Sequence, residues 1–477
     1  MSNVGLEMQS EGLAGSMMVQ TVAGLHRYRL GLVSAAALAL SGCGGTPVAI
    51  TEMSAALTAE LVATSVDAGA PVALGAGFKP AVARAVETNA GYRAALALER
   101  EAASRVGVAE SARRPQLSAE ANLGGVREFG SDGETITGIT AGISLSQLVF
   151  DGGESVAVIN RSTAEALGAR AERAARANEL ALDVARSWID AWQYEERLRL
   201  LRTRTEEMDT LLGQIERMAT TGMLDRAALD SARRQIVDIE LEETRLQSDL
   251  ADAQVRFRRH FRQAPGGLSR PVDILTPAAA RAQARAWQNA PGLEARAASV
   301  IAARHAVEEA EAAFSPRIRL QTGLRTPMDT ADPASGNFGL GFDYSMLDGG
   351  RRVNQLQASI ARRVAVEEQL REAQTTLEAE LEAALARLSG IERSMPLVDE
   401  QIRLSESEAA TARSQITTGQ SNLRQLVEAE IQNYRARDRQ IALQAERQML
   451  LLTITAQTGA LAEIIGIDTD EQAAVGE

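Results

Sequence analysis

The residue types that most often carry catalytic or metal chemistry are scarce in this sequence and stand apart from one another. The chain has three histidines, His26, His260 and His305, and one cysteine, Cys43. His260 and His305 stand singly in helical stretches, so each is interpreted as a packed or solvated histidine rather than a metal ligand. The sequence has no recognisable Ser/His/Asp set, phosphate loop or zinc-ligand spacing. We therefore expect a protein that is not an enzyme and that holds no cofactor or metal ion.

The single cysteine has a different chemistry available to it. A basic segment (26–29) precedes eleven apolar positions (30–40), and Leu-Ser-Gly-Cys occupies residues 40–43. This order is typical of a secretory signal, and the apolar run is too short to span a bilayer. Leu-Ser-Gly-Cys resembles the bacterial lipobox, which predicts a cleaved signal peptide (1–42) and a lipid anchor at Cys43. The alternative is an ordinary secretory signal with a chance cysteine.

The composition favours long packed helices. Only 3% of the 477 residues are aromatic, whereas 45% are hydrophobic, with Ala and Leu prominent among them. The formal net charge is −13, and every basic residue except Lys79 is an arginine. An acidic chain without a basic block is a poor binder of nucleic acid, so no nucleic-acid partner is expected.

One sequence plan occurs twice in the chain. Asp-Gly-Gly occurs at 151–153 and at 348–350, and Thr-Thr-Gly at 220–222 and at 417–419, so each motif recurs after 197 residues. Because two motifs about seventy residues apart keep this spacing, the chain is interpreted as a tandem duplication. The predicted domains are a signal peptide (1–42), a lipidated N-terminal linker (43–77) with no assigned fold, a first repeat (78–275), a second repeat (276–467) and an acidic C-terminal tail (468–477).

Each repeat is expected to run helix, two strands, helix, helix. Helical stretches (79–112 and 277–314) end near Pro115 and Pro316, because proline forbids continuation of a helix. The hydrophobic period then changes to two, which predicts strands with one apolar and one polar face. The apolar positions are Leu117, Ala119, Ala121, Leu123, Ile139, Ala141, Ile143, Leu145, Ile318, Leu320, Thr322, Leu324, Phe338, Leu340, Phe342 and Tyr344.

Each Asp-Gly-Gly motif is interpreted as a joint between a membrane strand and a long helix. The strands have the length and the single apolar face of transmembrane β-strands, but four strands leave open edges that lipid does not tolerate. The sheet must therefore be completed by copies of the chain. A heptad pattern follows each joint and predicts a helix of roughly 100 Å. The alternative is an ordinary turn in a soluble α+β protein.

The residues of the two joints have distinct expected roles. Asp151 and Asp348 are expected to cap the following helix through a side-chain oxygen. The glycines permit backbone angles that other residues resist. These glycines are Gly152, Gly153, Gly349 and Gly350.

From about Phe78 to Ile467, the duplicated hairpins, joints and long helices, together with the lipobox, resemble the TolC-type outer-membrane efflux family. The resemblance implies an α+β membrane protein that forms a homotrimer. Four strands per chain would build a twelve-stranded outer-membrane β-barrel, which continues into a periplasmic α-helical barrel. It also implies attachment to outer-membrane lipid, and a passive exit duct whose partners are a periplasmic adaptor (membrane fusion) protein and an inner-membrane transporter.

The ends of the long helices that lie farthest from the strands are expected to contain the sites where a partner docks and where the channel closes. Gly222 and Gly419 indicate helix-to-helix turns with glycine in left-handed backbone, and the resemblance implies that these tips meet the adaptor. Leu229 and Leu426, seven residues beyond each glycine, are expected to hold the returning helix. The candidate constriction residues are the nearest carboxylates, Asp225, Asp230 and Glu428. Glu428 matches an acidic position of the family, whereas Gln425 departs from a second one.

Three other functions fit parts of the pattern. Within the family, the chain could be the outer-membrane component of a type I protein secretion system. A periplasmic adaptor also has an anchor and a helical hairpin, but it has one hairpin rather than two hairpins and two strand pairs. A purely structural coiled coil does not account for the segments of period two.

Overall fold

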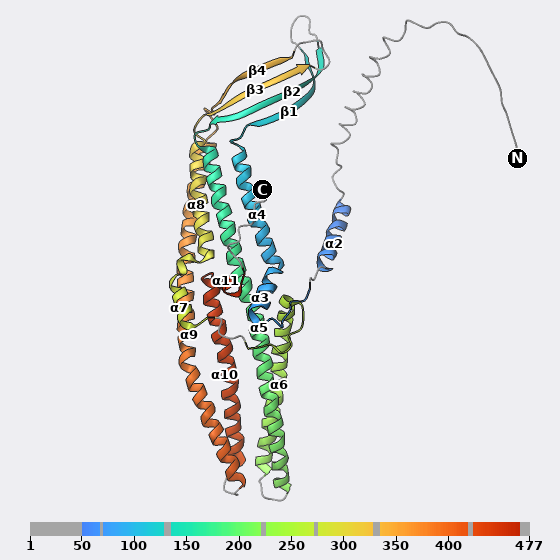
Figure 1. Ribbon diagram of the computed structural model, residues 1–477, viewed down its shortest axis with the longest axis vertical. Helices are drawn as coiled ribbons and strands as arrows, with labels where there is room; N and C mark the ends of the chain where they lie inside the picture. Colours follow the sequence, from blue (N-terminus) through green and yellow to red (C-terminus); the bar gives the residue numbers. More distant parts are fainter. Residues whose placement is uncertain are drawn as a thin grey trace, which may run out of the picture. The chain divides into compact units, whose positions relative to one another are not determined.

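The computed structural model describes residues 50–66, 70–127, 135–220, 226–270, 275–327, 334–417 and 423–467 (Figure 1). The predicted signal peptide (1–42), Cys43 and the acidic tail (468–477) lie outside these residues. The chain divides into two units, Met1–Ala68 and Gly69–Glu477. In the first unit, helix α2 (Ile50–Val66) occupies part of the linker to which the sequence assigned no fold. Ala, Leu and Glu recur in this segment and have high helix propensity, which accounts for the difference.

The second unit confirms the duplicated order of elements. The first repeat contains α3 (Phe78–Glu87), α4 (Ala90–Ser111), β1 (Gln116–Arg127), β2 (Thr135–Phe150), α5 (Glu154–Thr220) and α6 (Arg226–Phe261). The second contains α7 (Pro277–Arg285), the 3-10 turn η1 (Trp287–Asn289), α8 (Pro291–Ala312), β3 (Arg317–Pro327), β4 (Ser335–Asp343), α9 (Arg351–Thr417), α10 (Leu423–Gln457) and α11 (Leu461–Ile465).

The first helical stretch of each repeat is broken, which the sequence analysis did not anticipate. Asn89 begins α4 by accepting a hydrogen bond from the backbone N–H of Gly91, at 2.7 Å. In the second repeat, Pro291 stands at the first turn of α8, where proline is tolerated because its missing N–H is not needed. A side-chain cap in the first repeat and a proline at a helix start in the second therefore divide stretches that looked continuous by composition.

The four strands form one antiparallel sheet in the order β1-β2-β3-β4. Leu117 lies opposite Leu145, Ile143 opposite Leu324, and Ile318 opposite Phe342. The apolar positions of neighbouring strands therefore share one face of the sheet, as the alternation predicted. A bulge between Leu148 and Phe150 shifts the β2–β3 register near the joint.

The two predicted long helices are present as α5 and α9, each of 67 residues. In Figure 1, α5 lies beside α6 and α9 lies beside α10. Helix α9 continues through Pro396, although proline removes one backbone hydrogen bond. Ile391 and Val398, on either side of it, are buried, so tertiary packing holds the helix at this point.

An aromatic cluster marks the core of the first repeat. Trp188 of α5 is only 1% exposed, and its ring centroid lies 5.6 Å from that of Phe78 and 5.6 Å from that of Phe261. Trp192 is also buried in this cluster. The two tryptophans, one helical turn apart on α5, therefore pack in the core.

Within the described residues, no helix combines the length and the apolar character needed to cross a membrane.

The shared apolar face of the sheet predicts which substitutions disturb membrane insertion. Ile143→Arg or Leu320→Arg should weaken insertion by about 2–4 kcal/mol if the residue lies near mid-bilayer, because each puts a charge on the apolar face. Ser144→Arg, a matched control on the polar face, should insert normally and change only conductance. Insertion is measured as the heat-resistant, membrane-embedded fraction of the expressed protein. Equal losses for Ile143→Arg and Ser144→Arg would contradict the assignment of the faces.

Candidate functional site at the joints and the helix tips

Both Asp-Gly-Gly joints have the same capped geometry. Asp151 accepts hydrogen bonds from the backbone N–H groups of Gly153, at 3.1 Å, and Ser155, at 2.7 Å. Asp348 accepts from those of Gly350, at 3.1 Å, and Arg352, at 3.3 Å. The capping contacts predicted for both aspartates are therefore present. All four glycines have left-handed backbone: φ is 68° at Gly152, 95° at Gly153, 66° at Gly349 and 86° at Gly350.

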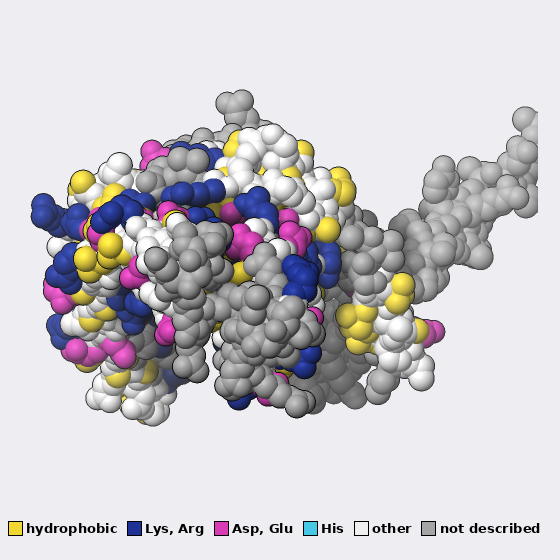
Figure 2. Space-filling model, turned by 90° about the horizontal axis from the view of Figure 1, so that it is seen from below, with side chains coloured by type: hydrophobic (Ala, Val, Ile, Leu, Met, Phe, Trp, Pro, Cys, Tyr) yellow, Lys and Arg dark blue, Asp and Glu magenta, His cyan; other side chains and the backbone are white. Residues whose placement is uncertain are grey.

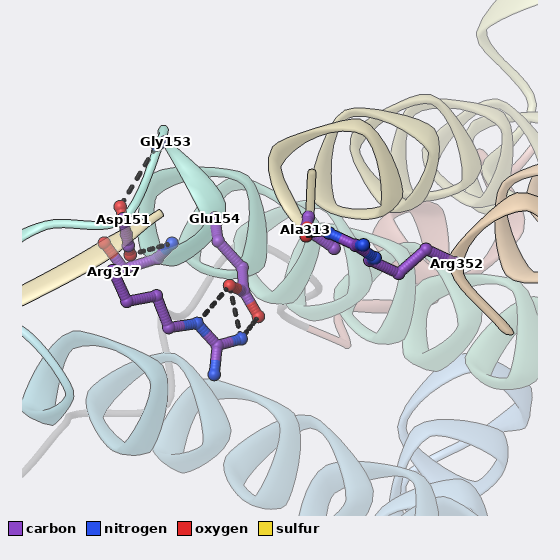
Figure 3. A network of polar contacts seen from close by, with 7 residues as sticks. Asp151, Gly153, Glu154, Ala313, Arg317 and Arg352 are labelled. Carbon is purple, nitrogen blue, oxygen red and sulfur yellow. Dashed lines mark hydrogen bonds and ion pairs between the residues drawn. The ribbon is translucent and has the colours of Figure 1, made fainter. Parts of the chain in front are cut away.

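The first joint is fixed to the beginning of the second hairpin. Arg317 of β3 points toward Glu154 at the start of α5 and donates to it through Nε, at 2.9 Å (Figure 3). A Cβ on Gly152 would lie 2.2 Å from the Cβ of Ser315, so a side chain there would displace the backbone. The strand, the helix and the neighbouring hairpin are thus held together at one place.

The second joint is held by an arginine of its own helix. Arg352 donates to Asp348 at 2.7 Å and to the carbonyl oxygen of Ala313 at 3.4 Å. Its guanidinium lies 5.2 Å from the ring centroid of Phe314, a cation–π distance. The hydrogen bond from Arg352 holds the pKa of the Asp348 carboxyl below its ordinary value.

The predicted tip residues are only partly described by the structure. Gly222, Gly419 and Asp225 lie outside the described residues, and for Leu229 only the backbone in α6 is described. Leu426 of α10 is 2% exposed, so it packs inside the helical layer. Asp230 of α6 and Glu428 of α10 are both exposed, on different helices.

An ionic cluster near the tips was missed by the sequence analysis. Glu430 of α10 is only 5% exposed, and Arg204 of α5 donates to it at 3.2 Å. Arg413 of α9 forms an ion pair with the other oxygen of Glu430. Burial lowers the pKa of the Arg204 guanidinium, and the carboxylate opposes this effect. A hollow of about 280 Å³, lined by residues of the same three helices, adjoins the cluster.

A second ion pair joins the same two helices farther from the tips. Arg197 of α5 donates to both carboxylate oxygens of Asp438 of α10, at 2.6 and 3.0 Å. Burial, followed by the Asp438 charge, raises the pKa of the neighbouring Tyr434 phenol. Helix α5 of the first repeat is therefore tied to α10 of the second by two ion pairs. Seen from the tip end, acidic and basic side chains are interspersed over the described helices (Figure 2).

A signal for Glu430 was present in the sequence. Leu426 belongs to the apolar face of α10, and Glu430 follows it by four residues, one helical turn, so the two share a face. Glu428 is two residues from Leu426 and therefore points elsewhere. A carboxylate at a buried heptad position indicates a charged partner on a facing helix.

The two described histidines have separate surroundings. Burial, with the nearby Arg259 charge, lowers the pKa of His260 in α6. The Nδ1 atom of His305 lies 2.8 Å from a carboxylate oxygen of Glu308. In the part of the chain that the structure describes, no group of three His, Cys, Asp or Glu residues is arranged to hold a metal ion.

The duplicated hairpins, capped joints and paired long helices define an outer-membrane efflux channel. Residues 82–260 and 283–460 both match the outer membrane efflux protein family, one match in each repeat. The chain therefore belongs to the outer membrane efflux protein family.

Relatives and solved structures agree with this assignment. The chain is 27% identical to outer membrane efflux protein BepC of Brucella suis biovar 1 (strain 1330) over 342 residues, 65% of this chain and 70% of that protein. Its fold is similar to CusC, with a TM-score of 0.70 and 18% identity over 79% of this chain and 90% of that one. It is also similar to the Campylobacter jejuni CmeC outer membrane channel, with a TM-score of 0.69 and 13% identity over 82% of this chain and 86% of that one.

These findings confirm the expected class of protein. The fold is that of trimeric outer-membrane channels in which a β-barrel continues into a long helical barrel. The protein is an outer-membrane efflux channel that extends into the periplasm. The family is one of channel proteins that work with adaptors and inner-membrane pumps.

The buried ion pair between α5 and α10 predicts a large loss of stability when one partner is removed. Glu430→Ala should lower the free energy of unfolding by about 3–5 kcal/mol, because it leaves Arg204 buried with only the more exposed Glu207, at 3.7 Å, as a carboxylate partner. Glu428→Ala, an exposed carboxylate two residues away, is the matched control and should change it by less than about 0.5 kcal/mol. Urea unfolding in detergent, followed by circular dichroism, measures both. Replacing Arg204 and Glu430 together by Met should recover much of the loss; similar losses in all three variants would contradict the role of the ion pair.

Proposed function

We propose that this chain is the passive exit duct of a tripartite export system. A solute delivered by an inner-membrane transporter and a periplasmic adaptor would pass along the helical barrel and leave through the β-barrel. The observation that carries the proposal is the double occurrence of one assembly, a strand hairpin joined through a capped Asp-Gly-Gly to a 67-residue helix. Two such assemblies give one chain both a membrane sheet and a helical wall.

The helix tips are the proposed adaptor-docking sites. In the sequence, Gly222 stands between α5 and α6, and Gly419 stands between α9 and α10. Two observations support this assignment: α5 and α9 each continue for 67 residues beyond their joints, and Leu426 is buried close to the second turn. Leu229 is assigned the corresponding role in α6.

The exposed carboxylates near the tips are the proposed periplasmic constriction. Glu428 is the principal candidate because it is exposed on α10 of the second repeat. Asp230 is exposed on α6, and Asp225 is the third candidate of the set. A carboxylate that borders a narrow pore attracts cations and so affects conductance.

Proline substitutions at the tips test the proposed duct. Gly222→Pro or Gly419→Pro should give a folded, inserted trimer that no longer supports export, because proline fixes φ where a left-handed turn is expected. Export is measured as restored resistance to a toxic dye in a host that lacks its own channel but contains the matching pump and adaptor. Gly213→Pro, inside α5, is the contrasting variant and should reduce folding itself. Normal export by both tip variants at normal expression would contradict the docking assignment.

Single-channel recording tests the constriction. Glu428→Ala should change the closed-state conductance and cation preference more than Asp230→Ala, because Glu428 is the candidate that matches an acidic position of the family. Both residues are exposed, so neither substitution should change stability appreciably. A larger effect of Asp230→Ala would contradict the assignment to Glu428 and would indicate that the constriction is formed by the first repeat.

The lipid anchor is proposed at Cys43. Cys43→Ala should abolish labelling by a palmitate analogue and weaken membrane attachment, while the β-barrel still forms. The physical reason is that acyl chains add anchoring energy that is independent of the sheet. Labelling that persists in Cys43→Ala, or that is absent from the unsubstituted protein, would refute the anchor.

A further inference from the structure

A hollow of about 430 Å³ lies at the first joint, where β2 continues into α5 and α4 packs against α5 (Figure 1). Its lining includes Val108 of α4, Leu148 of β2, Val158 of α5 and Arg319 of β3. Cavities of this size hold solutes as large as a drug molecule. The joint therefore contains space for a small solute in addition to its structural contacts.

The strand residues that line the hollow all belong to the polar face of the sheet. Gln116 lies directly opposite Ser146, and Leu148 lies directly opposite Arg319. Directly opposite residues point to the same face of a sheet, and positions two apart along a strand share a face, which adds Arg317 to the set. In an outer-membrane barrel the polar face surrounds the aqueous lumen, so a solute in the lumen can reach the hollow.

Part of the lining is apolar although it borders the polar face. Leu148 occupies a polar-face position, Val108 is 70% exposed on α4, and Val158 is half-buried on α5. Removing such surface from water is favourable. The hollow therefore favours a solute with an apolar body.

Three arginines line the hollow, and one of them has no charged partner among the described residues. Arg317 donates to Glu154 at 2.9 Å, and Arg114 forms an ion pair with Glu110 at 3.1 Å. Arg319 is exposed and forms no ion pair within the part of the chain that the structure describes. Its guanidinium is therefore available to a carboxylate, sulfonate or phosphate of a solute.

The two carboxylates of the lining leave this charge uncompensated. Glu154 is occupied by Arg317. Asp151 accepts hydrogen bonds from two backbone N–H groups around the start of α5, at 3.1 and 2.7 Å. Each acidic group thus has partners of its own, and Arg319 gives the hollow its preference for an anion.

We propose that this hollow binds an amphipathic organic anion, with the acidic group on Arg319 and the apolar body against Val108, Leu148 and Val158. The inference rests on the channel function proposed above, because it takes the polar face to line the duct. It adds to that function the chemical class of a solute that the duct holds at the joint.

The equivalent hollow at the second joint differs at two deciding positions. It has a volume of about 610 Å³, and Asp343 and Ser345 stand in it 197 residues after Ser146 and Leu148. A carboxylate thus takes the place of a hydroxyl, and a hydroxyl takes the place of an apolar side chain. The site is therefore assigned to the first joint alone.

Equilibrium dialysis of the full-length protein in lipid nanodiscs tests the site. The probe is naphthalenesulfonate, and empty nanodiscs of the same lipid give the blank. Binding should be saturable, and Arg319→Gln should weaken it about tenfold because the sulfonate loses its charged partner. Arg325→Gln is the matched control: it removes an exposed arginine from the same face of the same strand, outside the hollow, and should change the affinity by less than about twofold.

A second pair of measurements tests the apolar wall. Leu148→Ser should weaken naphthalenesulfonate binding at least about threefold, because less apolar surface is buried. Methanesulfonate, which has the acidic group without the apolar body, should bind at least about tenfold more weakly than naphthalenesulfonate.

The outcomes separate this site from the proposed function, because binding is measured without a pump or an adaptor. Equal losses in Arg319→Gln and Arg325→Gln, or no saturable binding above the blank, would overturn the site while the channel proposal stands. Equal affinity for the two sulfonates would overturn the amphipathic class and indicate a simple anion site. Binding that depends on Arg319 in a protein that supports no export would leave the site and overturn the proposed function.

Discussion

Backbone hydrogen bonding in lipid is the constraint on which the rest of this structure depends. Every N–H and C=O of a membrane strand must have a partner, and a four-stranded sheet leaves the outer edges of β1 and β4 without one inside the chain. Pairing with other copies satisfies these groups without additional strands. The duplication gives the chain two hairpins of the same form, which pair with each other through β2 and β3. The barrel therefore follows from one hairpin design used repeatedly.

The same constraint explains the form of the joints. The second strand of each hairpin must leave the membrane and become a helix, over three residues after β2 and seven after β4, and the first N–H groups of that helix lack intrahelical partners. Asp151 and Asp348 each satisfy one of these groups and also the N–H of the glycine just before the helix, while the paired glycines reverse the backbone through left-handed angles. The Glu154–Arg317 ion pair then ties the start of α5 to the next hairpin. The direction of each long helix is thereby set by the sheet.

Local sequence patterns predicted the strands, the joints and the long helices. Features that depend on packing between distant segments were not predicted. These predictions succeeded because each pattern depends on residues that are close together in the sequence: apolar and polar residues alternate in the strands, Asp-Gly-Gly forms the joints, and heptad spacing marks the long helices. The break at Asn89 was missed because a cap inside an Ala-rich stretch resembles an ordinary polar position. Glu430 was missed in favour of Glu428 because Glu428 matches an acidic position of the family, although the four-residue spacing from Leu426 already placed Glu430 on the buried face of α10. The tip glycines could be proposed from spacing, but their conformation lies outside the described residues.

The contact between α5 and α10 combines apolar packing with ion pairs. Beside the short helices α3 and α11, Trp188 and Trp192 of α5 share one apolar cluster with Ala445 and Leu452 of α10. Toward the tips, the Arg197–Asp438 and Arg204–Glu430 ion pairs join the same helices. A second apolar cluster lies there as well, in which Val427 and Tyr434 of α10 pack against buried leucines of α5. Separating the apolar end would expose hydrophobic surface to water, at a cost of about 25 cal/mol per Å². Separating the ionic end exposes charges that water solvates, which offsets much of the lost attraction. Because the ion pairs toward the tips lie beside this second apolar cluster, both ends of the α5–α10 contact are held together by buried apolar surface.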